Sequence, residues 1–221
     1  MQQPAPSSIL DRRWKTLCYL DGQLYQNGCF HSKGTFMFET QQFVGDCRAA
    51  LNEANAHAAV KEIVSKAVAE PSAVLKTLGE PKLAGIQTLY RSDQLTILNV
   101  LWGPCMFLYP HDHRMWAVIG IYGGREENAF YRRSDGELTT VGTKTLDTKD
   151  VIPLGDSIIH AVTNPLEKIT AAIHVYGEDF FAVPRSEWDP KTYQERPFDV
   201  AAAMRVFEES NTRLRAAESA N

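Results

Sequence analysis

The sequence predicts a mainly β protein, a barrel or jelly roll with helices before it and one helix after it. Residues 84–183 of the 221 contain many short strand-forming runs, with turn signals about every 8 to 12 residues. These runs do not alternate with helical patterns, as strands of a parallel α/β sheet would. Helix-forming residues gather instead between residues 40 and 80 and between 198 and 217.

Three helices are expected from these patterns. A helical face within 40–80 is shared by Val60, Ile63, Val64 and Ala67. Pro71 can open a short second helix there, which Gly79 and Pro81 would end. The last helix, about 198–217, would bury a stripe of Ala201, Met204, Phe207 and Leu214.

Four segments of the β region carry clear strand patterns. The run Leu95–Trp102 is rich in strand formers, and Lys168–Tyr176 reads as another strand. Trp116–Tyr122 is almost continuously apolar, which suits a strand covered on both faces, although a short buried helix has the same pattern. A hairpin is expected around Ser134-Asp135-Gly136, because Asp-Gly supplies the positive φ values of a tight turn.

Composition and charge exclude several classes of protein. Hydrophobic residues make up 44% of the chain and charged residues 23%, which is typical of a folded protein in water. A net charge of −4 argues against nucleic-acid binding and against a polybasic membrane surface. No apolar stretch is long enough to cross a membrane, and no secretory signal is expected. The four cysteines form no CxxC motif, so we expect a cytoplasmic protein with free thiols.

Three histidines are the candidate metal ligands. His111 and His113 flank Asp112, and alternation along a strand points both imidazoles to one face. An isolated pair of this kind has a structural alternative, in which both rings are exposed or hydrogen-bonded within the protein. His160 shifts the balance, because it follows the turn signal Pro153–Asp156 and opens a later strand. Three histidines brought to one depth of a barrel favour a metal site.

These residues resemble the two halves of the cupin signature. The matching positions are Gly103, His111 and His113, then Pro153, Gly155, His160 and Asn164. Most cupins with this signature add a Glu after the His pair as a fourth ligand, but residues 114–118 contain no carboxylate. A three-His cupin with His-Asp-His resembles the thiol dioxygenases, the cysteine dioxygenase family. The resemblance covers about residues 40–185 and implies a double-stranded β-helix, a jelly-roll barrel.

Further stretches are similar to the same family. Tyr90-Arg91 lies one strand before the His pair, where the family keeps a Tyr/Arg pair that anchors the substrate carboxylate. The hydrophobic strand 98–103 precedes the metal strand as in that family. His174 and Tyr176 match its His-x-Tyr after the third ligand.

Two departures from the family are visible. Ala172 stands where the family usually has Ser, two residues before the histidine at 174. Some members cross-link a Cys to the active-site Tyr, but no Cys follows His113. Cys105 lies six residues before His111, about 20 Å along an extended strand. We therefore expect Tyr176 to be an unmodified phenol.

The resemblance implies roles for these residues. Arg91 would grip a substrate carboxylate with its planar fork, assisted by Tyr90, and the alternative is a surface Arg paired with Asp93. Tyr176 would donate a hydrogen bond to bound oxygen with support from His174, and the alternative is a core Tyr satisfied by backbone.

The expected function is that of an iron-dependent thiol dioxygenase. The resemblance implies Fe(II) at the three histidines, with Zn or Ni as possible metals, and addition of O₂ to the sulfur of cysteine or 3-mercaptopropionate to give a sulfinate. Three neutral histidines leave an Fe(II) site at +2, which suits a thiolate. The alternatives are a cupin of other chemistry, such as a carbon–carbon-cleaving dioxygenase or a Zn or Ni enzyme, and a non-catalytic small-molecule-binding cupin.

The remaining expectations concern organisation and partners. We expect one structural domain in three parts, with an N-terminal arm and helices over 1–83, the barrel over 84–185 and a C-terminal extension and helix over 186–221. The partners would be a small thiol and O₂, without nucleic acid or membrane, in a monomer or small homo-oligomer. His57 and His31 are expected to be solvent residues, and Gly120–Gly124 lacks the spacing of a nucleotide loop.

Overall fold

The structure, a computed structural model, describes residues 19–20, 23–24, 37–134 and 137–219. The chain divides into two compact units, residues 1–35 and 36–221. In the first unit, β1 (Tyr19–Leu20) and β2 (Gln23–Leu24) pair in antiparallel fashion. His31 lies outside the described residues, so its expected role stays a prediction. All the elements below belong to the second unit.

Helices precede the barrel, as predicted, but they are three rather than the two expected there: α1 (Thr40–Ala50), α2 (Ala56–Val68) and α3 (Pro71–Leu78). The side chain of Asn55 caps α2 by accepting a hydrogen bond from the Ala58 amide at 3.0 Å. Pro71 occupies the first turn of α3, where its missing N–H costs nothing. Gly79 follows α3 with a φ of +88°, which residues with a side chain rarely adopt.

The barrel consists of two antiparallel sheets. Its strands are β3 (Gly85–Arg91), β4 (Thr96–Trp102), β5 (Phe107–Asp112), β6 (Ala117–Gly123), β7 (Arg125–Ser134), β8 (Glu137–Asp147), β9 (Val151–Leu154), β10 (Ile159–Thr163), β11 (Thr170–Tyr176), β12 (Ser186–Trp188) and β13 (Glu195–Pro197). One sheet has the order β13-β12-β5-β10-β7-β8 and the other β3-β4-β11-β6-β9. The chain passes from one sheet to the other at β4–β5, β5–β6, β6–β7, β8–β9, β9–β10, β10–β11 and β11–β12, which produces the predicted double-stranded β-helix.

The predicted hairpin and the two-sided strand are both confirmed. Strands β7 and β8 pair from Arg125↔Asp147 to Ser134↔Glu137, while the turn residues 135–136 lie outside the described part of the chain. Strand β6 is buried along nearly its whole length. Its outer face packs on α2 so closely that a Cβ at Gly120 would lie 2.5 Å from Val64 Cγ1. This glycine lets the helix approach the sheet.

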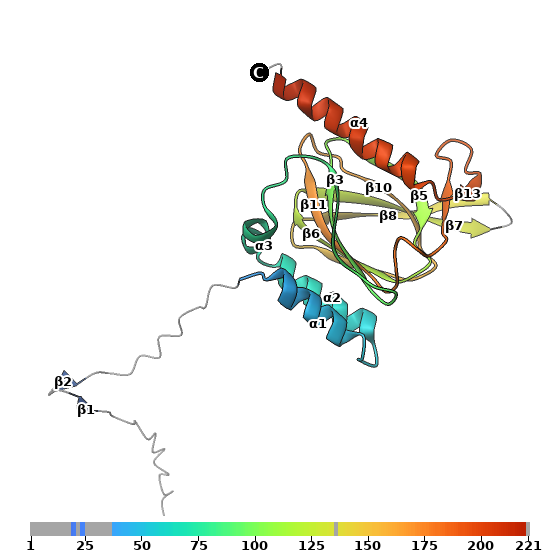
Figure 1. Cartoon of the computed structure of the whole chain (residues 1–221). Coiled ribbons are helices and arrows are strands. Elements are labelled where there is room, and N and C mark those ends of the chain that lie inside the picture. Colours follow the sequence, from blue (N-terminus) through green and yellow to red (C-terminus); the bar gives the residue numbers. More distant parts are fainter. Residues whose placement is uncertain (1–18, 21–22, 25–36, 135–136, 220–221) are drawn as a thin grey trace, which may run out of the picture. The chain divides into compact units, whose positions relative to one another are not determined.

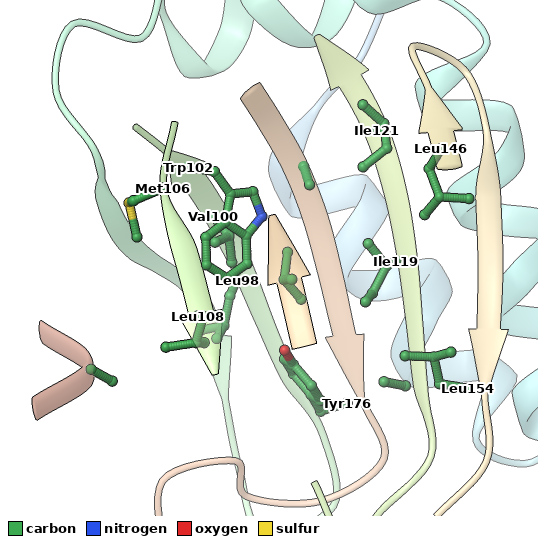
Figure 2. Packing of buried hydrophobic residues seen from close by; sticks show 14 of the residues in the cluster. Leu98, Val100, Trp102, Met106, Leu108, Ile119, Ile121, Leu146, Leu154 and Tyr176 are labelled. Atoms are coloured by element: carbon green, nitrogen blue, oxygen red, sulfur yellow. The ribbon is translucent and has the colours of Figure 1, made fainter. Parts of the chain in front are cut away.

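The inner faces of the two sheets enclose one hydrophobic core. Side chains of both sheets contribute, and Figure 2 shows Leu98, Val100, Trp102, Leu108, Ile119, Ile121 and Tyr176 gathered between the strands. A second cluster, the helix-side cluster, joins α1, α2 and α3 to the outer face of the five-stranded sheet, where Ile97, Val118, Ile173 and Val175 are buried. Side chains therefore alternate along β11, with Ile173 and Val175 on the face that packs against the helices.

Helix α4 (Val200–Ser219) is also present, but its buried stripe differs from the predicted one. Figure 1 shows α1 and α2 on one side of the barrel and α4 on another. Ala203 and Phe207 are buried, and Phe207 stacks on Trp102 with ring centroids 5.5 Å apart. Ala201 and Met204 are exposed. The prediction misplaced the stripe because polar Ser210 and Asn211 belong to the buried face.

Asn211 and Ser210 attach α4 to the barrel. The Asn211 side chain accepts a hydrogen bond from the Ala84 amide at 2.7 Å and donates one to the Ala84 carbonyl at 3.0 Å. Ser210 lies directly against Gly103, where any added Cβ would overlap its side chain. A glycine at 103 is therefore required by the packing of α4. Among the described residues, no helix is long and apolar enough to cross a membrane.

Candidate metal centre and its pocket

Neighbouring strands of the six-stranded sheet bring the three predicted ligands together. His111 lies on β5, and its Cα partner on β10 is His160. Side chains of directly opposed residues share one face of an antiparallel pair. His113 lies just after β5, two positions beyond His111, on the same face. The fold therefore joins an early His pair and a late His at one depth of the barrel.

The three imidazoles point their ligating nitrogens at one another. Their ligand atoms all lie within 4.8 Å of each other. Nε2 of His113 lies 3.3 Å from Nε2 of His111 and 3.4 Å from Nε2 of His160. Two nitrogens bound at about 2.0–2.1 Å to one tetrahedral ion would lie about 3.3–3.4 Å apart. The donor set and its spacing therefore fit a first-row divalent metal ion.

Hydrogen bonds on the far side of two rings set their tautomers. Nδ1 of His111 lies 2.9 Å from the Tyr109 carbonyl oxygen, and Nδ1 of His160 lies 2.7 Å from Oδ1 of Asn128. Both partners are acceptors, so each Nδ1 carries the proton and donates it. The Nε2 lone pairs are then free for a metal. Such outer partners orient ligand rings in many metal sites.

Burial keeps the three rings neutral. It lowers the pKa of His111 to about 4, and it lowers the pKa values of His113 and His160 well below 6.5, with mutual repulsion of the rings adding to the effect. Neutral imidazoles are the form that binds a metal. No base is needed to deprotonate the site near neutral pH.

Asp112, between the two histidines, faces away from them. Its Oδ2 accepts a hydrogen bond from Arg114 Nε at 2.8 Å, and its Oδ1 accepts one from the Ser186 amide at 2.7 Å. Arg114 reaches this position with a φ of +59° and also donates to the Ser186 hydroxyl at 3.0 Å. Asp112 therefore links β5 to β12. Because its carboxylate is turned away, the three histidines alone form the donor cluster among the described residues.

The histidines line one wall of a cavity of about 280 Å³. Most of its lining is apolar and comes from both sheets, from residues 180–200 and from α4, including Val100, Leu108, Phe180 and Met204. The polar lining side chains are Thr88, Trp102, His111, His113, His160, His174, Tyr176 and Arg185. No Asp or Glu is among the described lining residues. Arg185 is thus the permanent charge in this lining.

Arg185 was not singled out by the sequence. Its guanidinium carbon lies 3.8 Å from the Phe180 ring centroid and 4.3 Å from that of Phe198, and a guanidinium N–H donates to the Phe180 carbonyl. Among the described residues, no carboxylate forms an ion pair with it, and its Nε is buried without a hydrogen-bond partner. A half-buried guanidinium held by two aromatic rings is suited to an anionic ligand.

The expected anchor pair, Tyr90 and Arg91, lies outside the described pocket lining. A bulge in β3 between Thr88 and Tyr90 breaks the alternation, so Thr88 lines the pocket while Tyr90 packs in the helix-side cluster. Arg91 donates two hydrogen bonds of 2.9 Å to Asp179. The alternative hypothesis, a surface pair with an aspartate, named Asp93 as the partner instead. The Asp179 carboxylate occupies the Arg91 guanidinium, and the anchor role expected of Arg91 stays a prediction.

His174 and Tyr176 do reach the pocket from β11. Nδ1 of His174 lies 2.9 Å from the Tyr176 hydroxyl oxygen. The Tyr176 ring meets His113 edge-on, with centroids 5.0 Å apart. Burial lowers the pKa of His174 to about 3 and raises that of Tyr176, so both groups are neutral at ordinary pH. Tyr176 can therefore offer a hydroxyl beside the candidate metal centre.

Sequence reasoning also missed Glu126 and Asn128. Both are buried on β7, and Asn128 donates from Nδ2 to Glu126 Oε1 at 2.9 Å. In the sequence they stand in Arg125–Asn128, which has the composition of an exposed turn. Their two-residue spacing just before Phe130, another inward residue, was the available signal.

Cys47, Cys105 and His57 lie away from the pocket. Cys105 is exposed in the turn before β5, with a φ of +51°, and Cys47 is buried in the helix-side cluster. Neither is in the described lining, while Cys18 and Cys29 lie outside the described residues. His57, expected in solvent, is partly buried instead. Its Nε2 lies 3.1 Å from the Ala117 carbonyl oxygen and its ring stacks on Trp116.

Comparison with known proteins gives likenesses of fold. No protein-family profile matches the chain. Among solved structures, it is similar to an RmlC-like cupin with a double-stranded β-helix from Methanocaldococcus jannaschii, at 11% identity over 46% of this chain and 86% of that one, with a TM-score of 0.38. A cupin superfamily protein from Desulfitobacterium hafniense shows 17% identity over 48% and 88%, with a TM-score of 0.36. An oxalate decarboxylase variant from Bacillus subtilis shows 14% identity over 47% and 27%, with a TM-score of 0.37.

Proposed function

We propose that this protein is a metal-dependent oxygenase that oxidises the sulfur of a small thiol carboxylate. The overall reaction would be RSH + O₂ → RSO₂H, in which both oxygen atoms go to sulfur. The observation that carries the proposal is the pairing of a three-histidine cluster with a single unpaired guanidinium, Arg185, in one mostly apolar pocket. The two features match the two ends of a thiol carboxylate.

The residues that would hold the metal are His111, His113 and His160. Three neutral ligands leave the full +2 charge of a divalent ion, whereas a carboxylate ligand would lower it. Fe(II) is the proposed metal because, when bound, it supplies open coordination positions and the redox chemistry for a thiol to react with O₂. The chain's own contribution is a buried, neutral donor set.

Arg185 would bind the carboxylate end of the substrate. Its fork can donate two parallel hydrogen bonds to a carboxylate, and stacking on Phe180 and Phe198 limits its motion. Burying an ammonium group without a counter-charge is costly. Because the described lining contains no acidic side chain, we propose a substrate without an amino group, of the 3-mercaptopropionate kind, in preference to cysteine.

Tyr176 would orient the reacting end. Its hydroxyl stands beside His113 and is hydrogen-bonded to His174, so it can bind a ligand held at the histidines. The apolar walls from β4, β5 and α4 would keep competing water out of the pocket. Together these groups place the substrate between a fixed cation, a neutral hydroxyl and the three imidazoles.

An oxygen electrode and product analysis test the proposal. Protein loaded with Fe(II) anaerobically is mixed with 3-mercaptopropionate, cysteine or cysteamine in buffer that contains O₂. The mass of the product is then measured by mass spectrometry. We expect stoichiometric O₂ uptake with 3-mercaptopropionate and a product two oxygen atoms heavier, with weaker activity on the two amines. No sulfinate from any of these thiols, despite a full complement of iron, would contradict the proposed reaction.

A further inference from the structure

A chain of buried polar side chains runs behind the pocket from one metal ligand to the pocket hydroxyl. His160 Nδ1 lies 2.7 Å from Asn128 Oδ1, and Asn128 Nδ2 donates to Glu126 Oε1 at 2.9 Å. Glu126 Oε2 lies 4.0 Å from His174 Nε2, and His174 Nδ1 lies 2.9 Å from the Tyr176 hydroxyl. Both ends of this chain line the pocket, while Glu126 at its centre does not.

Glu126 is a fully buried carboxyl without a basic ion-pair partner. Its side chain is 0% exposed, and among the described residues no Lys or Arg forms a salt bridge with it. Burial raises its pKa to about 7, against the opposing effects of the Asn128 amide and the Trp102 indole. Burying a carboxyl of this kind costs free energy unless its oxygen atoms form hydrogen bonds with neighbouring groups.

Three buried polar atoms around this carboxyl have no hydrogen-bond partner at normal distance among the described residues. They are Glu126 Oε2, His174 Nε2 and Trp102 Nε1. The Trp102 and His174 rings lie 6.2 Å apart. Ala172, which shares a strand face with His174, offers no polar group. The Glu126 carboxyl is therefore the group that can satisfy His174 Nε2, and a shortening of the gap by about 1 Å makes a hydrogen bond.

We propose that Glu126 is a positioning residue that sets the tautomer of His174 and, through it, the direction in which the Tyr176 hydroxyl donates its proton. The groups facing Glu126 are Asn128 on its own strand, Trp102 from β4, and His174 with Tyr176 beyond it from β11. The proposal concerns hydrogen bonds of this chain alone and does not depend on which reaction the pocket performs.

In the first arrangement Glu126 is a carboxylate. A carboxylate only accepts, so His174 must carry its proton on Nε2 and donate it to Glu126. Nδ1 is then a bare lone pair and accepts the proton of the Tyr176 hydroxyl. Tyr176 donates inward, and its oxygen lone pairs alone face the pocket.

In the second arrangement Glu126 is a neutral acid. It donates its proton to His174 Nε2, so the ring carries its own proton on Nδ1 and donates it to the Tyr176 oxygen. The hydroxyl proton of Tyr176 is then released to donate into the pocket. Replacing Glu126 by Gln fixes this arrangement, because the amide NH₂ donates to His174 while its oxygen still accepts from Asn128.

The ¹⁵N chemical shifts of the His174 ring test the proposal directly. They distinguish a protonated from a bare ring nitrogen and can be recorded on the full chain after chelation of paramagnetic metal, with assignment by His174→Gln. At about pH 9, roughly two units above the raised pKa of Glu126, we expect wild-type His174 to be protonated at Nε2. In Glu126→Gln we expect the proton at Nδ1.

The matched control is Glu127→Gln, the exposed neighbour on the same strand, which should keep the wild-type tautomer. The same His174 tautomer in wild type and in Glu126→Gln would overturn the proposal. Should the Gln variant fail to fold, the wild-type spectrum decides alone, because a proton on Nδ1 at about pH 9 would also overturn it. A purely structural role for Glu126 would change stability without inverting this signal.

Discussion

The Nδ1 atom of His160 donates to Oδ1 of Asn128 across 2.7 Å, in a fully buried hydrogen bond between β10 and β7. This contact fixes which nitrogen of a candidate metal ligand keeps its lone pair. Asn128 is held in turn by its own donation to Glu126, so its amide cannot rotate without breaking a second hydrogen bond. The orientation of the third ligand thus depends on a side chain that never touches the pocket.

Replacing Asn128 by Leu should weaken metal binding about 10- to 100-fold, the range found for lost outer partners of ligating histidines. The expected cause is loss of the acceptor that holds His160 with a bare Nε2. Competition with a fluorescent chelator measures the affinity. The matched control is Asn52→Leu, at an exposed site near α1, which should leave affinity unchanged. An Asn128→Leu variant with wild-type affinity would remove this orienting role.

Replacing Arg185 by Gln should raise the KM for 3-mercaptopropionate by about 30- to 1,000-fold, which corresponds to roughly 2–4 kcal/mol for a buried charge pair that loses one partner. A thiol without a carboxylate should be affected far less, because it never used the guanidinium. Initial rates at varied substrate give the comparison. Arg91→Gln, whose native partner is Asp179, is the control and should change KM little. The reverse ranking of the two variants would restore Arg91 as the anchor.

The metal-free chain should lose stability as the pH falls below 6.5. Burial lowers the pKa of His111 to about 4 and of His174 to about 3, and it lowers those of His113 and His160 well below 6.5. Between these values and 6.5 the unfolded chain binds more protons than the folded one. The free energy of unfolding therefore rises with pH there, by up to about 1.4 kcal/mol per pH unit for each histidine.

Glu126 acts in the opposite direction over part of the same range. Its pKa is raised from 4.5 to about 7, so the folded chain binds the additional proton between those values. One carboxyl offsets about one of the four histidines, and the net slope stays positive. Urea unfolding with chelator at about pH 7.5 and pH 5.5 measures it. Equal or greater stability at the lower pH would show that the four rings are not held neutral by burial.

Two glycine substitutions should shift stability in opposite directions. Gly120→Ala places a methyl group 2.5 Å from Val64 Cγ1 and should destabilise the fold by about 1–3 kcal/mol as α2 is pushed from β6. Gly45→Ala lies on the exposed face of α1 with open space around it and should stabilise by about 0.5–1 kcal/mol. Thermal unfolding measures both. A neutral Gly120→Ala would mean that α2 does not approach the sheet this closely.

The helices, most strands and the metal cluster could be predicted because their signals are periodic and local. Alternation alone placed His111 and His113 on one face, and the turn before β10 marked His160 as the start of another strand. The surroundings of Tyr90 and Arg91 could not be predicted in this way, because one bulge in β3 turns Tyr90 outward and Arg91 pairs with Asp179. Arg185 lies in the irregular segment between β11 and β12, so only the tertiary fold brings it to the pocket.

Glu126 was missed for a related reason. Glu126 follows Gly123-Gly124-Arg125, a composition that is typical of an exposed turn. The burial of its carboxyl becomes visible only once β7 is known to lie between β8 and β10. Its neighbour Glu127 is the same type of residue, but its side chain is exposed. The pleat of the strand, which the sequence pattern did not resolve, separates the two.

Elemental analysis of the purified protein and of four variants tests the central claim most directly. The wild-type chain should bind close to one first-row metal ion per chain. Alanine at His111, His113 or His160 should reduce that content severalfold while the far-ultraviolet circular dichroism stays unchanged. His57→Ala, a partly buried histidine outside the pocket, should keep full occupancy. Retention of one metal per chain in a folded variant at any of the three positions would contradict a metal centre built from these histidines.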